Sequence, residues 1–161
     1  MPVSFVSARK IMNLILWRHA EAEDGIPDNT RPLTPKGKKQ ADKMAAFLRV
    51  ILPQDTRVLA SPAKRTRQTA QAFTSHFTVE AKIGTGASAE DILRAANWPG
   101  EEDSVLIVGH QPALGETAAL LMTGHADCWS IKKGAVWWFS RDAREGACQT
   151  SLRLVIAPEH L

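Results

Sequence analysis

The apolar residues of this chain fall into short continuous runs and into stripes with helical spacing. Met12 to Trp17 and Ser104 to Val108 are short apolar runs bounded by polar or turn-forming residues. Such runs are typical of strands buried on both faces of a sheet. Arg57 to Ala60 predicts a further short strand, and Val79 to Lys82 another.

The helical stripes follow residues that begin helices. Thr34-Pro35 precedes apolar positions at helical spacing and predicts a helix from about Pro35 to Leu52, because Thr is a good N-cap and Pro suits the first helical position. Ser61-Pro62 repeats this pattern, so we expect Ser61 to cap the next helix. Further helices are predicted over Ala89 to Asn97 and from Pro112 to about Gly124.

The last third of the chain predicts a hairpin. Ala135 to Phe139 and Leu152 to Ile156 have strand patterns, and Asp142 to Gly146 between them is typical of a turn. Because strands and helices alternate before this hairpin, we predict an α/β fold. The expected architecture is a three-layer α/β/α sandwich with a mostly parallel sheet and an antiparallel edge hairpin. We expect residues 1–11 to form an N-terminal extension and residues 12–161 a single domain.

Composition narrows the function classes. The chain has 161 residues, of which 44% are hydrophobic and 23% charged, with a formal net charge of +3. This mildly basic charge fits an anionic substrate. Lys and Arg are spread along the chain without a basic block, so we expect no nucleic acid partner. No apolar run approaches the ~20 residues of a membrane span, so we expect no membrane association and a cytoplasmic location. The two cysteines, Cys128 and Cys148, have no C-x-x-C or zinc spacing.

Polar residues follow three of the predicted strands. Arg18-His19 follows the strand that begins at Met12, Ser61 and then Arg65 follow the strand that begins at Arg57, and His110 follows the strand that begins at Ser104. Ligands of open α/β sheets bind outside the carboxyl ends of the strands. Two arginines and two histidines there predict a compact cationic pocket, and a phosphoryl group is the dianion that best matches it.

Four segments resemble the histidine phosphatase (phosphoglycerate mutase-like) superfamily. Arg18-His19-Ala20 is similar to its Arg-His-Gly signature, and Gly109-His110 to the segment with its second histidine. The stretch from Ser61 to Ala70 resembles the Ser-Pro-x-x-Arg-x-x-Gln-Thr motif. Arg31-Pro32-Leu33-Thr34 with Gly37 resembles the SixA branch, the protein phosphohistidine phosphatases.

The resemblance implies a mechanism without a metal or other cofactor. His19 would attack phosphorus and carry it as a phosphohistidine intermediate. Arg18 and Arg65 would bind the equatorial phosphoryl oxygens, and His110 would join them. Arg31 would add a further substrate contact. We also expect phosphate- and vanadate-type anions to bind there.

The general acid is the least defined part of this scheme. Larger branches of the family use a glutamate in an inserted segment that this chain is too short to hold. Glu21, Glu23, Glu90 and Asp28 are the candidates, and we favour Asp28 because it lies a short step before Arg31. A phosphoramidate substrate would relax the need, since an imidazole leaving group is more easily protonated than an alkoxide.

Three functions fit this pattern. The first is a metal-independent phosphatase that acts through His19 on phosphohistidine in a protein. The second keeps the chemistry but acts on a small phosphorylated metabolite, and the third is a phosphate-binding module without turnover. A cysteine phosphatase fits the sequence poorly, because neither cysteine has an arginine six residues on. The sequence also has no Walker-type phosphate loop.

Overall fold

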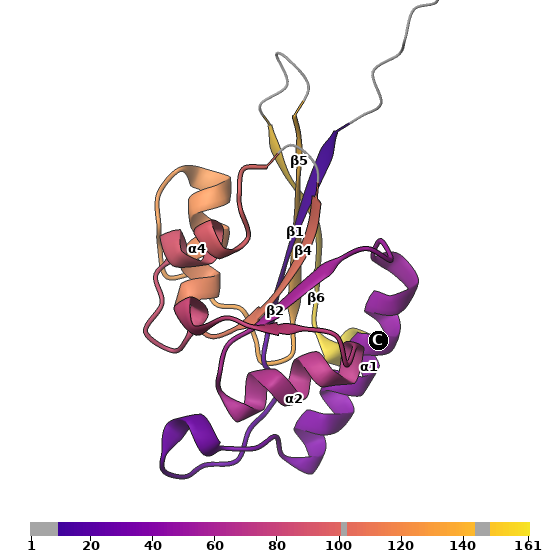
Figure 1. Ribbon diagram of the computed structural model, residues 1–161, viewed down its shortest axis with the longest axis vertical. Coiled ribbons are helices and arrows are strands. Elements are labelled where there is room, and N and C mark those ends of the chain that lie inside the picture. Colours follow the sequence, from indigo (N-terminus) through magenta and orange to yellow (C-terminus); the bar gives the residue numbers. More distant parts are fainter. Residues whose placement is uncertain (1–9, 101–102, 144–148) are drawn as a thin grey trace, which may run out of the picture.

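The computed structural model describes residues 10–100, 103–143 and 149–161 (Figure 1). The strands of these residues are β1 (Ile11–Arg18), β2 (Arg57–Ala60), β3 (Thr78–Val79), β4 (Asp103–Gly109), β5 (Val136–Asp142) and β6 (Thr150–Ile156). The α-helices are α1 (Pro35–Ile51), α2 (Lys64–Phe73), α3 (Ala89–Ala95) and α4 (Ala113–Thr123), and short 3₁₀ turns cover Asp28–Thr30, Ala81–Ile83 and Pro158–His160.

The strands form one mixed sheet in the order β3-β2-β4-β1-β5-β6. The neighbours β3, β2, β4 and β1 are parallel, whereas β5 runs antiparallel to β1 and β6 antiparallel to β5. The predicted antiparallel hairpin at one side of a parallel sheet is therefore confirmed. The outer part of its predicted turn, residues 144–148, lies outside the described residues.

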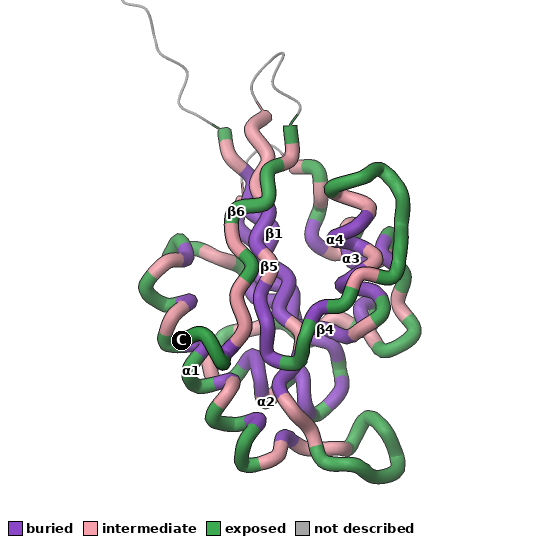
Figure 2. The backbone as a smooth tube through the Cα atoms, turned by 180° about the vertical axis from the view of Figure 1, so that it is seen from behind, coloured by how far each residue is buried: buried purple, intermediate pink, exposed green. Residues whose placement is uncertain are grey.

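Helices cover both faces of the sheet, as the predicted three-layer sandwich requires. One apolar cluster joins α1 and α2 to the sheet through residues such as Met44, Leu48 and Trp17. The other joins α3 and α4 to the opposite face through residues such as Ile92 and Leu114. Figure 1 shows α4 on one side of the strands and α1 with α2 on the other. Figure 2 shows the buried residues concentrated in the strands between these layers.

The central strands owe their burial to their sequence. Every residue of β1 from Met12 to Trp17 is buried, and so is every residue of β4 from Ser104 to Gly109. A continuous apolar run suits a strand with helices on both faces. β1 begins at Ile11, and residues 1–9 of the predicted N-terminal extension lie outside the described part.

The structure confirms one predicted helix start and corrects two other local predictions. Thr34 caps α1 as predicted, since its side chain accepts a hydrogen bond from the Gly37 amide (2.9 Å). Val79 to Lys82 is not a strand, because pairing ends at Val79 and a 3₁₀ turn follows. Ser61 does not cap α2, which begins at Lys64 with Ala63 as its N-cap.

Candidate active site

Sheet order brings three polar strand ends together. β4 lies between β2 and β1, and its register places Gly109 beside Arg18 and Val108 beside Ala60. The His19 amide donates to the Gly109 carbonyl (3.1 Å), and the Ser61 amide donates to the Val108 carbonyl (3.1 Å). His19, Ser61 and His110 therefore meet at the carboxyl edge of the sheet, as the sequence predicted.

His19 is a neutral, buried ring that is fixed by the backbone. Its Nδ1 lies 2.7 Å from the Ala20 carbonyl oxygen, which can only accept a hydrogen bond, so Nδ1 carries the proton. Its Nε2 then keeps a lone pair, and Arg65 Nε donates to it (3.3 Å). The side chain is only 7% exposed, and this burial lowers the pKa of His19 to about 3. At neutral pH, Nε2 is therefore unprotonated.

His110 faces His19 across the pocket. The two ring centroids are 5.3 Å apart, and His110 is also buried. Burial lowers the pKa of His110 to about 4, and the nearby guanidinium of Arg65 adds to the effect. Its Nε2 lies 2.6 Å from the hydroxyl of Ser61, so this serine contacts the second histidine instead of capping α2.

Arg65 connects the two histidines. Arg65 occupies the first turn of α2 and is 3% exposed. Its Nε donates to His19, and its Nη2 lies 3.5 Å from His110 Nδ1. Because Nε–H and one N–H of Nη2 point to the same side of a planar guanidinium, this side faces the space between the two rings. That side can bind two phosphoryl oxygens at once.

Arg18 is held by the loop that precedes β5. Its Nη1 donates to the Ile131 carbonyl (2.7 Å), and the Gly134 amide donates to the carbonyls of Arg18 and His19 (3.1 and 3.0 Å). Gly134 has a φ of +76°, a conformation that side-chain-bearing residues rarely adopt. Among the described residues, Arg18 Nε is a buried donor without a protein acceptor.

Asp28 lies against the outer end of Arg65. Arg65 Nη1 donates to the Asp28 carbonyl (2.9 Å), and Arg65 Nη2 donates to Asp28 Oδ2 (3.0 Å). Arg31 donates from Nε and Nη2 to Asp28 Oδ1 (3.1 and 2.9 Å), while its Nη1 donates to the Glu23 carbonyl. The hydrogen bonds from Arg31 and then from Arg65 hold the pKa of the Asp28 carboxyl below its usual range.

These contacts bear on the predicted roles of Asp28 and Arg31. The structure brings both residues to the pocket, but it places Asp28 as an ionised carboxylate between two guanidinium groups. A carboxyl with a lowered pKa is poorly suited to donate a proton at neutral pH. Arg31 reaches the pocket through Asp28, and its five N–H donors include none that contacts a histidine ring.

The other candidate acids do not replace Asp28. Glu21 accepts from Thr34 Oγ1 (3.1 Å) and pairs with Lys36 (3.5 Å). Glu90 lies in the first turn of α3. In the described part of the chain, the side chains of Glu21, Glu23 and Glu90 make no hydrogen bond to His19 or His110.

Several residues that support the site had no role predicted from the sequence. Thr66 contacts the Ser61 hydroxyl (2.7 Å), and Thr69 Oγ1 accepts from the Ala20 amide (3.2 Å). Gly37 lies so close to the Glu21 carbonyl that a Cβ there would collide with it. The positions of Thr66 and Thr69 inside the Ser-Pro motif were the available signal, but spacing alone does not show which hydroxyl meets which partner.

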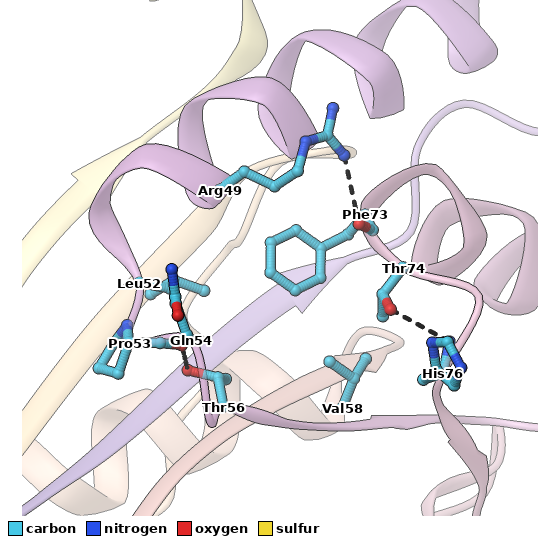
Figure 3. Close-up of a pocket in the computed structure, with 9 residues that line it drawn as sticks. All are labelled: Arg49, Leu52, Pro53, Gln54, Thr56, Val58, Phe73, Thr74 and His76. Atoms are coloured by element: carbon cyan, nitrogen blue, oxygen red, sulfur yellow. Dashed lines mark hydrogen bonds between the residues drawn. The ribbon is translucent and has the colours of Figure 1, made fainter.

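A separate hollow lies near the amino end of β2, away from the two histidines (Figure 3). It has a volume of about 430 Å³, and its lining includes Arg49, Phe73 and His76. Arg49 Nη1 donates to the Ala72 and Phe73 carbonyls, so its charge is directed at the end of α2. Neither His19 nor His110 lines this hollow, so the candidate active site is the pocket at the carboxyl edge of the sheet.

None of the helices in the described part of the chain has the length and apolar character needed to cross a bilayer. The His, Cys, Asp and Glu side chains of the same residues form no group of three or more with the arrangement of a metal site.

Comparison with known proteins agrees with this geometry. Residues 14–87, which include Arg18, His19 and Arg65, match the model of the histidine phosphatase superfamily (branch 1). A phosphohistidine phosphatase SixA homolog from Haemophilus influenzae is 32% identical over 127 residues, covering 68% of this chain and 77% of the relative. The chain belongs to the histidine phosphatase superfamily. It is accordingly a phosphatase, a hydrolase that acts on a phosphorylated substrate.

Solved structures show the same fold. A Nakamurella multipartitia protein assigned as phosphohistidine phosphatase SixA has a TM-score of 0.73 and 31% identity, over 92% of this chain and 96% of that one. The protein histidine phosphatase SixA in complex with tungstate has a TM-score of 0.78 and 23% identity, over 92% of this chain and 99% of that one. The α/β sandwich with its mostly parallel sheet is therefore the fold of this family.

Proposed function

We propose that this phosphatase removes the phosphoryl group from phosphohistidine in a protein, through a covalent intermediate on Nε2 of His19. His19 Nε2 would attack phosphorus as the bond to the leaving group breaks. Arg18 and Arg65 would bind the equatorial oxygens and stabilise their charge. Water would then cleave the phosphorus–nitrogen bond and release phosphate.

The ionised state of Asp28 is the observation that favours phosphohistidine as the substrate. An alkoxide leaving group needs a proton donor, and the Asp28 carboxylate, which contacts Arg65, is held ionised by Arg31 and Arg65. A phosphoimidazole that is protonated on its far nitrogen needs no such donor. When its phosphorus–nitrogen bond breaks, the electron pair stays on the ring, which leaves as neutral imidazole. The site as built therefore suits a phosphoramidate better than a phosphate ester.

The similarity to SixA proteins supports the same substrate class. Two proteins that are 31% and 32% identical to this chain are assigned to phosphohistidine phosphatases. A small phosphorylated metabolite is the second candidate, because Arg18 and Arg65 recognise the phosphoryl group and not the group that bears it. A phosphate-binding module without turnover is the third, and the nucleophile-ready state of His19 argues against it.

Side-by-side kinetics test the proposal. We expect kcat/KM for a phosphohistidine-bearing protein to exceed that for a phosphoserine peptide or a sugar phosphate by roughly 100-fold or more. General acid catalysis accelerates a reaction by a factor of about this size, and the site has no acid to supply it to the esters. His19→Ala should abolish turnover of all of them. A preference for the sugar phosphate would overturn the substrate assignment, and phosphate binding without any turnover would favour the binding module.

A further inference from the structure

The hydrogen bonds behind His110 form a short relay. His110 Nε2 contacts the Ser61 hydroxyl (2.6 Å), which contacts the Thr66 hydroxyl (2.7 Å). Thr66 in turn donates to the carbonyls of Ser61 and Ala63 (2.9 and 2.8 Å). Ser61 and Thr66 are both fully buried, so water cannot supply missing partners.

Counting protons along this relay assigns the tautomer of His110. The Thr66 hydroxyl proton is used on the backbone carbonyls, so the Ser61 hydroxyl must donate to Thr66. The proton between Ser61 and His110 must then come from His110 Nε2. Ser61 Oγ, which also accepts from the Ala63 amide (3.3 Å), thereby has one donated and two accepted hydrogen bonds.

The opposite tautomer leaves the relay unsatisfied. If Ser61 donated to His110 Nε2, then Thr66 would have to donate to Ser61. Two oxygen–oxygen contacts of 2.8 and 2.9 Å, between Thr66 and the carbonyls, would then lack a proton. In addition, Nδ1–H of His110 would face an N–H of Arg65 Nη2 at 3.5 Å, donor against donor. Buried polar groups are rarely left in such a state.

We propose that His110 is held as its Nε2–H tautomer by Ser61 and Thr66, and that its Nδ1 accepts the proton of the water that hydrolyses phosphorylated His19. Nδ1 lies beside Arg65 Nη2, whose guanidinium side faces the space between the two rings. His110 is thus a catalytic residue with a defined proton-accepting atom, and Ser61 and Thr66 are positioning residues. This inference rests on the proposed covalent mechanism.

The hydrolytic step balances in this arrangement. The water oxygen forms a bond to phosphorus while the bond from phosphorus to His19 Nε2 breaks. The electron pair of that bond returns to Nε2, and His19 keeps its Nδ1 proton on the Ala20 carbonyl. The water proton moves to His110 Nδ1, which makes His110 an imidazolium until the proton leaves to phosphate or solvent.

Nitrogen NMR of the wild-type protein tests the tautomer directly. Unprotonated and protonated imidazole nitrogens have well-separated ¹⁵N shifts, and the His110 signals can be assigned by their loss in His110→Asn. At neutral pH we expect His110 to show a protonated Nε2 and a bare Nδ1, with His19 showing the reverse. A protonated Nδ1 on His110 would overturn the proposal, whatever the substrate of the enzyme is.

Single-turnover kinetics test the role in hydrolysis. Thr66→Val removes the acceptor of the Ser61 proton at nearly constant volume, so Ser61 should donate to His110 and reverse its tautomer. With phosphoramidate as donor, we expect hydrolysis of phosphorylated His19 to slow by roughly 100-fold, and its formation to change by no more than about threefold. Thr66→Ser, which restores the hydroxyl, should recover both the tautomer and the hydrolysis rate.

Thr117→Val is the matched control. Thr117 is a buried threonine of α4 whose hydroxyl donates to the Ala113 carbonyl (2.7 Å), away from the relay, so both rates should stay at the wild-type level. If Thr66→Val slows both steps equally or neither, the proposal is wrong. If no donor ever labels wild-type His19, the covalent mechanism itself fails, while the NMR result still decides the tautomer.

Discussion

The two histidines of the site are buried side by side, but they present opposite ring nitrogens to the pocket. His19 holds its Nδ1 proton on a backbone carbonyl and presents Nε2. His110 contacts a side-chain hydroxyl through Nε2 and presents Nδ1. A backbone carbonyl cannot be removed by substitution, whereas a serine hydroxyl can. The ring of His19, the proposed nucleophile, is therefore fixed by the fold itself, and the ring of His110 by residues that mutation can change.

Removing the nucleophile should have the largest effect. His19→Asn leaves a polar group of similar reach but takes away the attacking nitrogen. We expect turnover to fall by at least about 10⁴-fold, because the asparagine side chain has no nitrogen lone pair that can attack phosphorus. The measurement is steady-state kinetics with a phosphohistidine protein. His76→Asn, an exposed histidine outside the site, should keep the wild-type rate, and appreciable residual turnover in His19→Asn would place the nucleophile elsewhere.

Substitution of Arg65 tests whether His19 and His110 act together. Arg65→Lys keeps a positive charge but loses the fork that contacts both His19 and His110. We expect kcat/KM to fall roughly 100- to 1000-fold, which is the usual effect of removing one preorganised hydrogen-bond donor to the transition state. Arg67→Lys, on the exposed side of α2, is the matched control. Equal, small losses in both variants would show that the bidentate contact is not used.

Asp28 separates positioning of Arg65 from proton donation. Asp28→Asn keeps the backbone carbonyl contact to Arg65 but weakens the ion pairs with Arg65 and Arg31. We expect about a tenfold loss of kcat/KM with the phosphohistidine protein, since Arg65 becomes less well held. Asp24→Asn, an exposed residue of the same loop, is the control.

The leaving group then distinguishes the two roles of Asp28. A positioning role predicts similar losses for phosphohistidine and for an aryl phosphate whose leaving group needs no proton. A loss confined to phosphate esters with poor leaving groups would instead identify Asp28 as the general acid.

Acid should weaken the fold through both histidines. Their pKa values in the folded protein, about 3 and about 4, lie below the ordinary value of 6.5 for an unfolded chain. The unfolded state therefore binds more protons between these values, and the free energy of unfolding falls as pH falls from about 6.5. By pH 5 the loss is up to about 2 kcal/mol per histidine.

Urea unfolding at pH 7 and pH 5 checks this effect. His19→Asn and His110→Asn should each remove a comparable part of the pH-dependent loss, because both rings are buried to a similar degree. If one variant loses as much unfolding free energy between pH 7 and pH 5 as the wild type does, the histidine replaced in it is already charged, or well solvated, in the folded protein.

Much of this site was predictable from sequence because it depends on strand ends. The apolar runs of β1 and β4 indicated where Arg18-His19 and His110 leave the sheet, and parallel neighbours bring such ends to one edge. The Ser-Pro motif placed Arg65 in the first turn of α2. These inferences need only element boundaries and the rule for ligand sites in α/β folds.

The remaining contacts depend on geometry that sequence does not encode locally. Ser61 meets His110 only because β2 and β4 are adjacent in the sheet, and the same serine carries an equally strong capping signal. The contacts of Arg18 and His19 with the loop at Ile131 and Gly134 use backbone groups, which every residue has. The ion pairs of Asp28 also required the path of the loop, so its effect on the general acid assignment could not be foreseen.

Acid-sensitive, base-stable labelling of His19 tests the central claim most directly. The enzyme is mixed with phosphoramidate labelled on phosphorus, quenched in base within the first turnover and digested to amino acids. We expect the label on His19, as the Nε2-linked phosphohistidine, and none in His19→Asn. Label on the Nδ1-linked isomer, or turnover without any labelled His19, would contradict the account.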